Sequence, residues 1–159
     1  MKTELTGTIR ALLDEYKKAI NELIAVIKQL NDEEILVMRD EKTSNDNCRT
    51  IQTVLTHVVY AGYGYTNFIE NRYGNKKERR PKHLLGNAKD YIDELNGMFS
   101  YCENFFLENP AIELEEYDTS KKILTHWGQV YDIDQLMEHA IVHVLKHRRQ
   151  IQRFLLPQS

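Results

Sequence analysis

Three of the six histidines of this chain recur at four-residue intervals near its C-terminal end, in the stretch EHAIVHVLKHRRQI. They are His139, His143 and His147. Side chains four residues apart are neighbours on the surface of an α-helix, so two of these imidazoles could grip one divalent metal ion. A pH-sensitive surface and ordinary packing are the alternatives. Because two ligands rarely suffice, a metal site here requires a third ligand from another part of the chain.

The three histidines are not equivalent on a helical wheel. A helix advances about 100° per residue, so each four-residue step drifts by about 40°. The apolar residues of this segment cluster into one arc that faces a core. His147 falls within one flank of the arc, His143 lies at its edge, and His139 lies one step further toward the polar side. We therefore expect His143 and His147 to project into the interior, with His139 at the rim.

A third ligand is best sought at the flank of another apolar stripe. His57, in TVLTHVVYAG, flanks the stripe that contains Val54, Val58 and Gly62, and the small Ala61 nearby leaves space for a cofactor. A single histidine is more often a surface or core residue than a ligand. Spacing alone therefore leaves the structural interpretation of these histidines open.

Several other kinds of site are excluded by the sequence. No Glu-x-x-His pair occurs, as a di-iron bundle would require, and HExxH and Walker-type glycine loops are absent. Cys48 and Cys102 lack a CxxC partner and read as ordinary thiols. His83 and His126 fall in predicted loops and cannot be placed on a wheel.

The candidate residues lie on segments with the periodicity of amphipathic helices. Apolar residues recur at three- and four-residue steps over residues 8–30, 50–72, 87–107 and 133–156. Asp132 is the expected N-cap of the last segment, and Pro157 ends it. The chain has 159 residues with only 7 Gly and 3 Pro. We expect one all-α domain over residues 1–159, folded as a four-helix bundle.

The interior of the second segment and the connections carry further signals. Gly62 and Gly64 predict close approach of a neighbouring backbone or a ligand, or a local kink. The basic stretch GNKKERRPKH, residues 74–83, reads as a solvated loop, because nothing aromatic is interleaved with its charges. Residues 108–132 exceed the roughly 2–8 residues usual between bundle helices. Within them, THWG places His126 beside the only tryptophan, and long ordered connections often carry function.

Composition gives no support for some classes of partner. Hydrophobic residues make up 42% and charged residues 28%, as in soluble globular proteins. The net charge of -3 gives no support for nucleic-acid binding, and the basic end KHRRQIQR is explained by the helix dipole. No segment has the pattern of a secretory signal or approaches the roughly 18 apolar residues of a membrane span. With two cysteines outside any disulfide framework, we expect a cytoplasmic protein that binds neither nucleic acid nor membrane.

The arrangement of motifs resembles the DinB/YfiT-like family of four-helix bundles. The resemblance rests on a histidine in the middle of the second predicted helix, His57, and on the terminal HxxxHRxQ that begins at His143. The preceding THWGQVYDIDQLMEHA is similar to one branch of that family, and the likeness covers most of the chain. The family commonly has Gly between the Arg and the Gln, where this chain has Arg149.

The resemblance implies a divalent metal, Zn²⁺ or Ni²⁺, held by His57, His143 and His147. Characterised members of the family include bacillithiol S-transferases and mycothiol-dependent maleylpyruvate isomerases, and many members are homodimers. The implied function is activation of a low-molecular-weight thiol for transfer to an electrophile, or of water for hydrolysis of a small-molecule substrate.

Further residues are candidates for supporting roles. Arg148 and Gln150 could orient ligands or an anionic substrate, while Tyr60 and His126 could lie at the mouth of the site; each also has a purely structural interpretation. His139 could support the site from its rim. The alternative function is a non-catalytic helical bundle that binds a partner protein or a small apolar ligand, with the histidines structural or pH-responsive.

Overall fold

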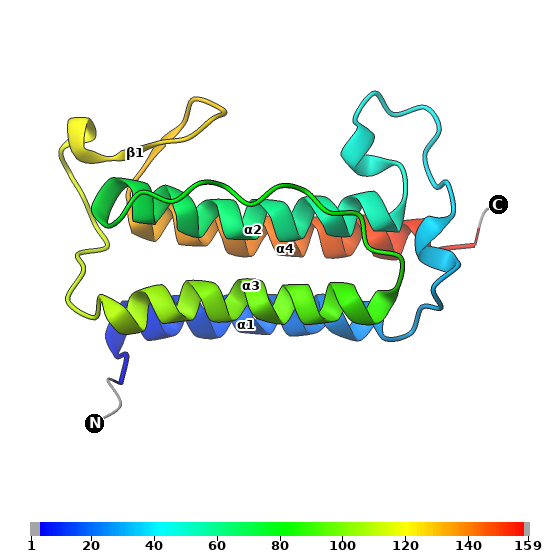
Figure 1. The fold of residues 1–159 in the computed structure, drawn as a ribbon, viewed down its shortest axis with the longest axis horizontal. Helices are drawn as coiled ribbons and strands as arrows, with labels where there is room; N and C mark the ends of the chain where they lie inside the picture. Colours follow the sequence, from blue (N-terminus) through cyan, green and yellow to red (C-terminus); the bar gives the residue numbers. More distant parts are fainter. Residues whose placement is uncertain (1–3, 158–159) are drawn as a thin grey trace.

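The four apolar stripes of the sequence form four long helices in a computed structural model that describes residues 4–157. They are α1 (Gly7–Ile27), α2 (Ile51–Tyr73), α3 (Ala88–Glu108) and α4 (Ile133–Phe154). Helices α2 and α4 lie side by side in one layer, and α1 and α3 form the other (Figure 1). Across the layers, α1 packs on α4 and α2 packs on α3. The predicted all-α four-helix bundle is therefore confirmed.

The helix directions require one long connection. Helices α1 and α4 run one way along the bundle, and α2 and α3 both run the other way (Figure 1). Because α2 and α3 are parallel neighbours, residues 74–87 must return along the whole length of the bundle before α3 begins. This crossover segment, residues 74–87, lies across α2 in Figure 1. The stretch predicted to be a solvated loop runs along the bundle, and its residues 74–83 are exposed except for the half-buried Arg79.

Side-chain caps fix where the helices that carry the site begin. At α2, the Thr50 hydroxyl accepts from the backbone N–H of Thr53, and the Thr53 hydroxyl accepts from the N–H of Thr50. At α4, Asp132 and Gln135 make the same reciprocal pair, which confirms the predicted N-cap. Such a capping box satisfies two backbone donors that the helix leaves unpaired. The α4 cap fixes the register that decides which way its histidines point.

The two glycines inside α2 leave room for side chains that pack closely against the helix. A Cβ on Gly62 would lie 1.8 Å from Sδ of the fully buried Met98 of α3. A Cβ on Gly64 would lie 2.5 Å from a guanidinium nitrogen of Arg79 in the crossover segment. Helix α2 continues through both positions, and the groups that approach the two glycines are side chains, where the sequence predicted a backbone, a ligand or a kink.

The long connection before α4 folds into a small hairpin. Strands β1 (Ile123–Leu124) and β2 (Val130–Tyr131) pair antiparallel, and Gly128 provides the positive φ of 90° in the turn between them. Three short 3₁₀ helices complete the described part of the chain: η1 (Glu34–Leu36), η2 (Asp46–Cys48) and η3 (Thr119–Lys121). None of the helices within residues 4–157 is both long enough and apolar enough to span a membrane.

Candidate metal centre

The fold brings together three histidines from the two helices of one layer. His57 comes from the middle of α2, and His143 and His147 come from successive turns of α4. One ring nitrogen from each lies within 4.8 Å of the other two. The two Nε2 atoms of His57 and His143 are 3.0 Å apart, although 86 residues separate them in the chain. We call these three residues the histidine cluster.

The cluster is partly buried between α2 and α4. His147 is only 4% exposed, and the other two histidines are half-buried. The ring of Tyr65, itself buried, lies 5.6 Å from that of His143. Among the described residues, no carboxylate or cysteine joins the cluster, so its only potential ligands are imidazole nitrogens. Imidazole suits Zn²⁺ and Ni²⁺, as it also suits copper and iron.

Hydrogen bonding already orients one imidazole for ligation. The Nδ1 atom of His147 lies 2.8 Å from Oε1 of Gln150, and a carbonyl oxygen only accepts, so Nδ1 carries the proton. The Nε2 lone pair of His147 is therefore free. This pairing of a ring N–H with an outer acceptor is what fixes the orientation of most metal-binding histidines. Gln150 thus acts through His147.

His143 is under-satisfied within the described structure. Its Nδ1 atom is buried and has no hydrogen-bond partner, and its Nε2 points at the Nε2 of His57. Two imidazole nitrogens that face each other can share one proton only as donor and acceptor. A cation between them would let both nitrogens act as electron-pair donors.

Burial keeps the cluster uncharged. Desolvation, followed by the neighbouring His147 and His57, lowers the pKa of His143 to about 2. Desolvation likewise lowers the pKa of His57 to about 4, and it also lowers that of His147. All three imidazoles are therefore neutral at physiological pH, which is the form that binds metal ions.

His139 lies outside the cluster, at its rim. Its ring stacks on Trp127 of the hairpin loop, with centroids 4.9 Å apart, and is 6.4 Å from the ring of His143. The hydroxyl of Tyr131 lies 3.3 Å from its Nδ1. Tyr65 contacts the same histidine with centroids 5.4 Å apart. These residues form an aromatic wall beside the cluster, defined here as Tyr65, Trp127, Tyr131 and His139.

The remaining predicted residues have other contacts. Arg148 makes an ion pair with Glu22 of α1, on the side of α4 that packs against the other layer. Tyr60 and His126 do not belong to the histidine cluster, but both contact Arg79. The guanidinium carbon of Arg79 lies 3.7 Å from the centroid of the Tyr60 ring, and Nη1 of Arg79 lies 3.4 Å from Nδ1 of His126.

Sequence reasoning missed the aromatic wall and Arg79. The wall depends on a two-residue strand pair too short to leave a periodic signal, although the THWG motif marked its position. Arg79 was assigned to a solvated loop because the aromatic residues that hold it belong to α2 and not to the basic stretch itself.

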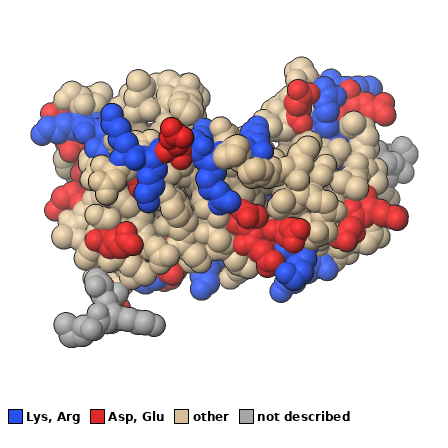
Figure 2. Space-filling view, viewed as in Figure 1, with Lys and Arg blue, Asp and Glu red and all other residues tan. Residues whose placement is uncertain are grey.

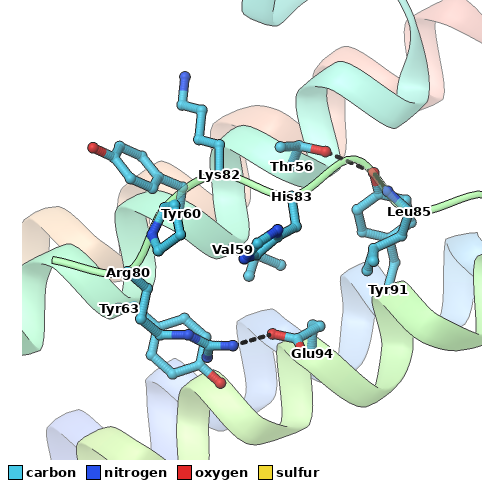
Figure 3. Close-up of a pocket in the computed structure, with 11 residues that line it drawn as sticks. Thr56, Val59, Tyr60, Tyr63, Arg80, Lys82, His83, Leu85, Tyr91 and Glu94 are labelled. Carbon is cyan, nitrogen blue, oxygen red and sulfur yellow. Dashed lines mark hydrogen bonds and ion pairs between the residues drawn. The ribbon is translucent and has the colours of Figure 1, made fainter.

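Away from the histidine cluster, a hollow lies on another face of α2. It has a volume of about 110 Å³ and lies between α2, α3 and the crossover segment (Figure 3). Its polar groups pair with one another: the hydroxyls of Thr56 and Tyr91 are 2.6 Å apart, and Arg80 lies 3.5 Å from Glu94. His83, which the sequence predicts to lie in a loop, lines this hollow.

In comparisons with known proteins, no family model, curated protein or solved structure matches this chain. The observations that stand are thus a four-helix bundle and a partly buried group of three histidines arranged so that it could hold a metal ion.

Proposed function

We propose that this chain is a divalent-metal-dependent enzyme of the DinB/YfiT-like family, with Zn²⁺ or Ni²⁺ held by His57, His143 and His147. The observation that carries the proposal is the convergence of three neutral imidazoles within 4.8 Å, drawn from two helices. The donor set fits such an ion in two further respects. Gln150 frees the Nε2 lone pair of His147, and the Nε2 atoms of His57 and His143 face each other 3.0 Å apart, where an ion could accept an electron pair from both.

The family assignment rests on the same positions that suggested it. The second and fourth helices carry the cluster, in the order that the resemblance implies. Arg149, which departs from the family pattern, is exposed on α4 and does not belong to the cluster. The departure therefore leaves the three histidines unaltered.

The proposed reaction is transfer of a low-molecular-weight thiol to an electrophile, or hydrolysis of a small-molecule substrate. A divalent ion supplies the chemistry by lowering the pKa of a thiol or water at an open coordination position. The chain's own residues bind the ion, orient its ligands and shield the site from water. The three histidines hold the ion without adding negative charge, Gln150 fixes the tautomer of His147, and the aromatic wall limits the access of water from the hairpin side.

A non-catalytic bundle that binds a partner or an apolar ligand is the second candidate. One observation favours it: four large apolar side chains are exposed on the hairpin and the adjoining face of α4, namely Leu124, Trp127, Val130 and Val142. Such a surface could equally serve the homodimer that the family resemblance implies. Light scattering on the purified protein distinguishes a monomer from a dimer.

The test of the proposed enzyme begins with metal content. Protein purified without a histidine tag should contain, or take up on addition of Zn²⁺ or Ni²⁺, about one ion per chain. The loaded protein should then conjugate a thiol to an electrophile, or hydrolyse an ester or amide, in a screen of both. A chain that takes up no ion contradicts the proposal. A chain that binds an ion but turns over no substrate, and instead captures apolar ligands or partners, supports the second candidate.

A further inference from the structure

Arg79 of the crossover segment lies against the face of α2 that carries the site. Its guanidinium packs on the Tyr60 ring and directly over Gly64, where a Cβ would lie 2.5, 2.8 and 2.9 Å from Nη2, Cζ and Nε. Only glycine at position 64 leaves room for the guanidinium so close to the helix. The absence of a side chain there therefore positions a positive charge.

This charge has no counter-ion within residues 4–157. Its neighbours in the crossover segment do: Lys77 pairs with Glu70 at 2.9 Å, and Arg80 pairs with Glu94 at 3.5 Å. The Nε of Arg79 is buried and has no hydrogen-bond partner at all. Its two terminal nitrogens make only long contacts, of 3.4 Å, to His126 and to the backbone carbonyl of Tyr60. A partly buried guanidinium with unused donors is costly unless an anion pairs with it.

Arg79 lies over the same face of α2 that carries His57 of the histidine cluster. Gly64 follows His57 by seven residues, so it lies on the same face of α2, about 10 Å further along the axis. His126, which contacts Arg79, also packs on Phe68 of that face, with ring centroids 4.9 Å apart. Figure 2 shows Lys and Arg side chains, with acidic side chains among them, on the face of the molecule where the crossover segment lies.

We propose that Arg79 binds a carboxylate of the small-molecule substrate whose sulfur or other reacting atom lies at the histidine cluster. This inference rests on the proposed function and adds a substrate class to it: an acid whose carboxylate lies on the order of 10 Å from the reacting atom. Arg79 supplies planar, charge-assisted hydrogen bonds that suit a carboxylate. It is a specificity-determining residue.

The first experiment compares two thiols of equal length on Co²⁺-loaded protein. They are 6-mercaptohexanoate, which has a carboxylate, and 6-mercaptohexanol, which is neutral; binding is followed by the sulfur-to-cobalt charge-transfer band. The wild-type protein should bind the acid about tenfold more tightly than the alcohol, as expected for one charge-assisted pair. The shorter 3-mercaptopropionate should show a smaller advantage because it cannot span the two positions.

Three variants test whether Arg79 causes the preference for the acid over the alcohol. Arg79→Gln removes the charge and should equalise the affinities for the acid and the alcohol. Gly64→Ala keeps the charge but displaces the guanidinium, and because only the flexible end of the Arg79 side chain must move, the fold should tolerate it. It too should lose the preference. Arg80→Gln, which removes an equal charge next to Arg79 that is already paired with Glu94, should keep it. A preference that survives in Arg79→Gln overturns the proposal.

A second experiment needs no metal. Metal-free protein is titrated with sodium hexanoate while the arginine Nε–Hε resonances are followed by NMR, with the Arg79 peak assigned by its loss in Arg79→Gln. The Arg79 peak should shift in a saturable manner, and the Arg80 peak should not. If no thiol produces the cobalt band in any variant, the thiol-transfer form of the proposed function fails, and this titration alone decides whether Arg79 binds carboxylates. Absence of the shift overturns the assignment of Arg79, whether or not the metal site exists.

Discussion

Replacing Gln150 with alanine should weaken zinc binding by about 10- to 100-fold, or about 1.4–2.7 kcal/mol. The acceptor Oε1 of Gln150 lies 2.8 Å from Nδ1 of His147 and keeps the proton on that nitrogen. Without the acceptor, the neutral imidazole can carry its proton on either nitrogen, and the ring loses the contact that holds its orientation. Zinc binding must then select the correct tautomer and rotamer, which reduces its affinity.

The same substitution should have a smaller effect on the metal-free fold. His147 is 4% exposed, so its Nδ1–H would lose a buried acceptor, at a cost of about 1–3 kcal/mol. Gln150 is itself half-buried, so water can enter where its side chain was. We therefore expect the free energy of unfolding of the metal-free protein to fall by only about 1 kcal/mol.

Two measurements and two matched variants separate these effects. Zinc affinity is measured by competition with a chromophoric chelator, and the stability of the metal-free protein by urea unfolding. Gln150→Glu keeps an acceptor at the same position and should retain zinc affinity, whereas Gln152→Ala, at an exposed position on the same helix, should change neither quantity. The reasoning is refuted if Gln150→Ala binds zinc as tightly as the wild type, or if Gln150→Glu is weakened equally.

Three further predictions address ligand choice, acid stability and thiol reactivity. His143→Ala should lose zinc binding in metal analysis. His139→Ala should still bind zinc at the wild-type ratio per chain, because the His139 ring lies outside the cluster and stacks on Trp127. The reverse result would show that the ligands are wrongly assigned. Burial lowers the pKa of His143 to about 2 in the folded state, whereas its pKa in the unfolded state is near 6.5. At pH values between these two, the unfolded state binds more protons than the folded state. The metal-free protein should therefore lose stability as the pH falls below about 6.5, by about 2 kcal/mol near pH 5 from this residue, and urea unfolding that is as stable near pH 5 as at neutral pH would contradict this. Burial also raises the pKa of Cys102 to about 12, so in the native state Cys102 should not react with Ellman's reagent while the half-buried Cys48 does; rapid reaction of both would show that the core opens.

The sequence alone was sufficient for the helices and for the division among the three regularly spaced histidines. Amphipathic periodicity is a local property, so it predicts all four segments, with ends displaced by at most three residues. Asp132 marked the start of α4 because capping depends only on neighbouring backbone groups. Helical drift placed His139 outside the pair that faces the interior, since the angle between residues on one helix follows from their spacing.

The contacts that complete the site depend on tertiary structure. No local rule brings His57 to within 3.0 Å of His143 across 86 residues; the wheel indicated a face, and only the packing of α2 beside α4 supplied the distance. Likewise, the apolar periodicity of α3 does not show in which direction the helix runs, because the pattern is the same in either direction. That direction forces the crossover segment along α2 and sets Arg79 against Gly64. The sequence thus determined which side chains face inward, while the order and direction of the helices, fixed by burial of all four stripes at once, decided which of them meet.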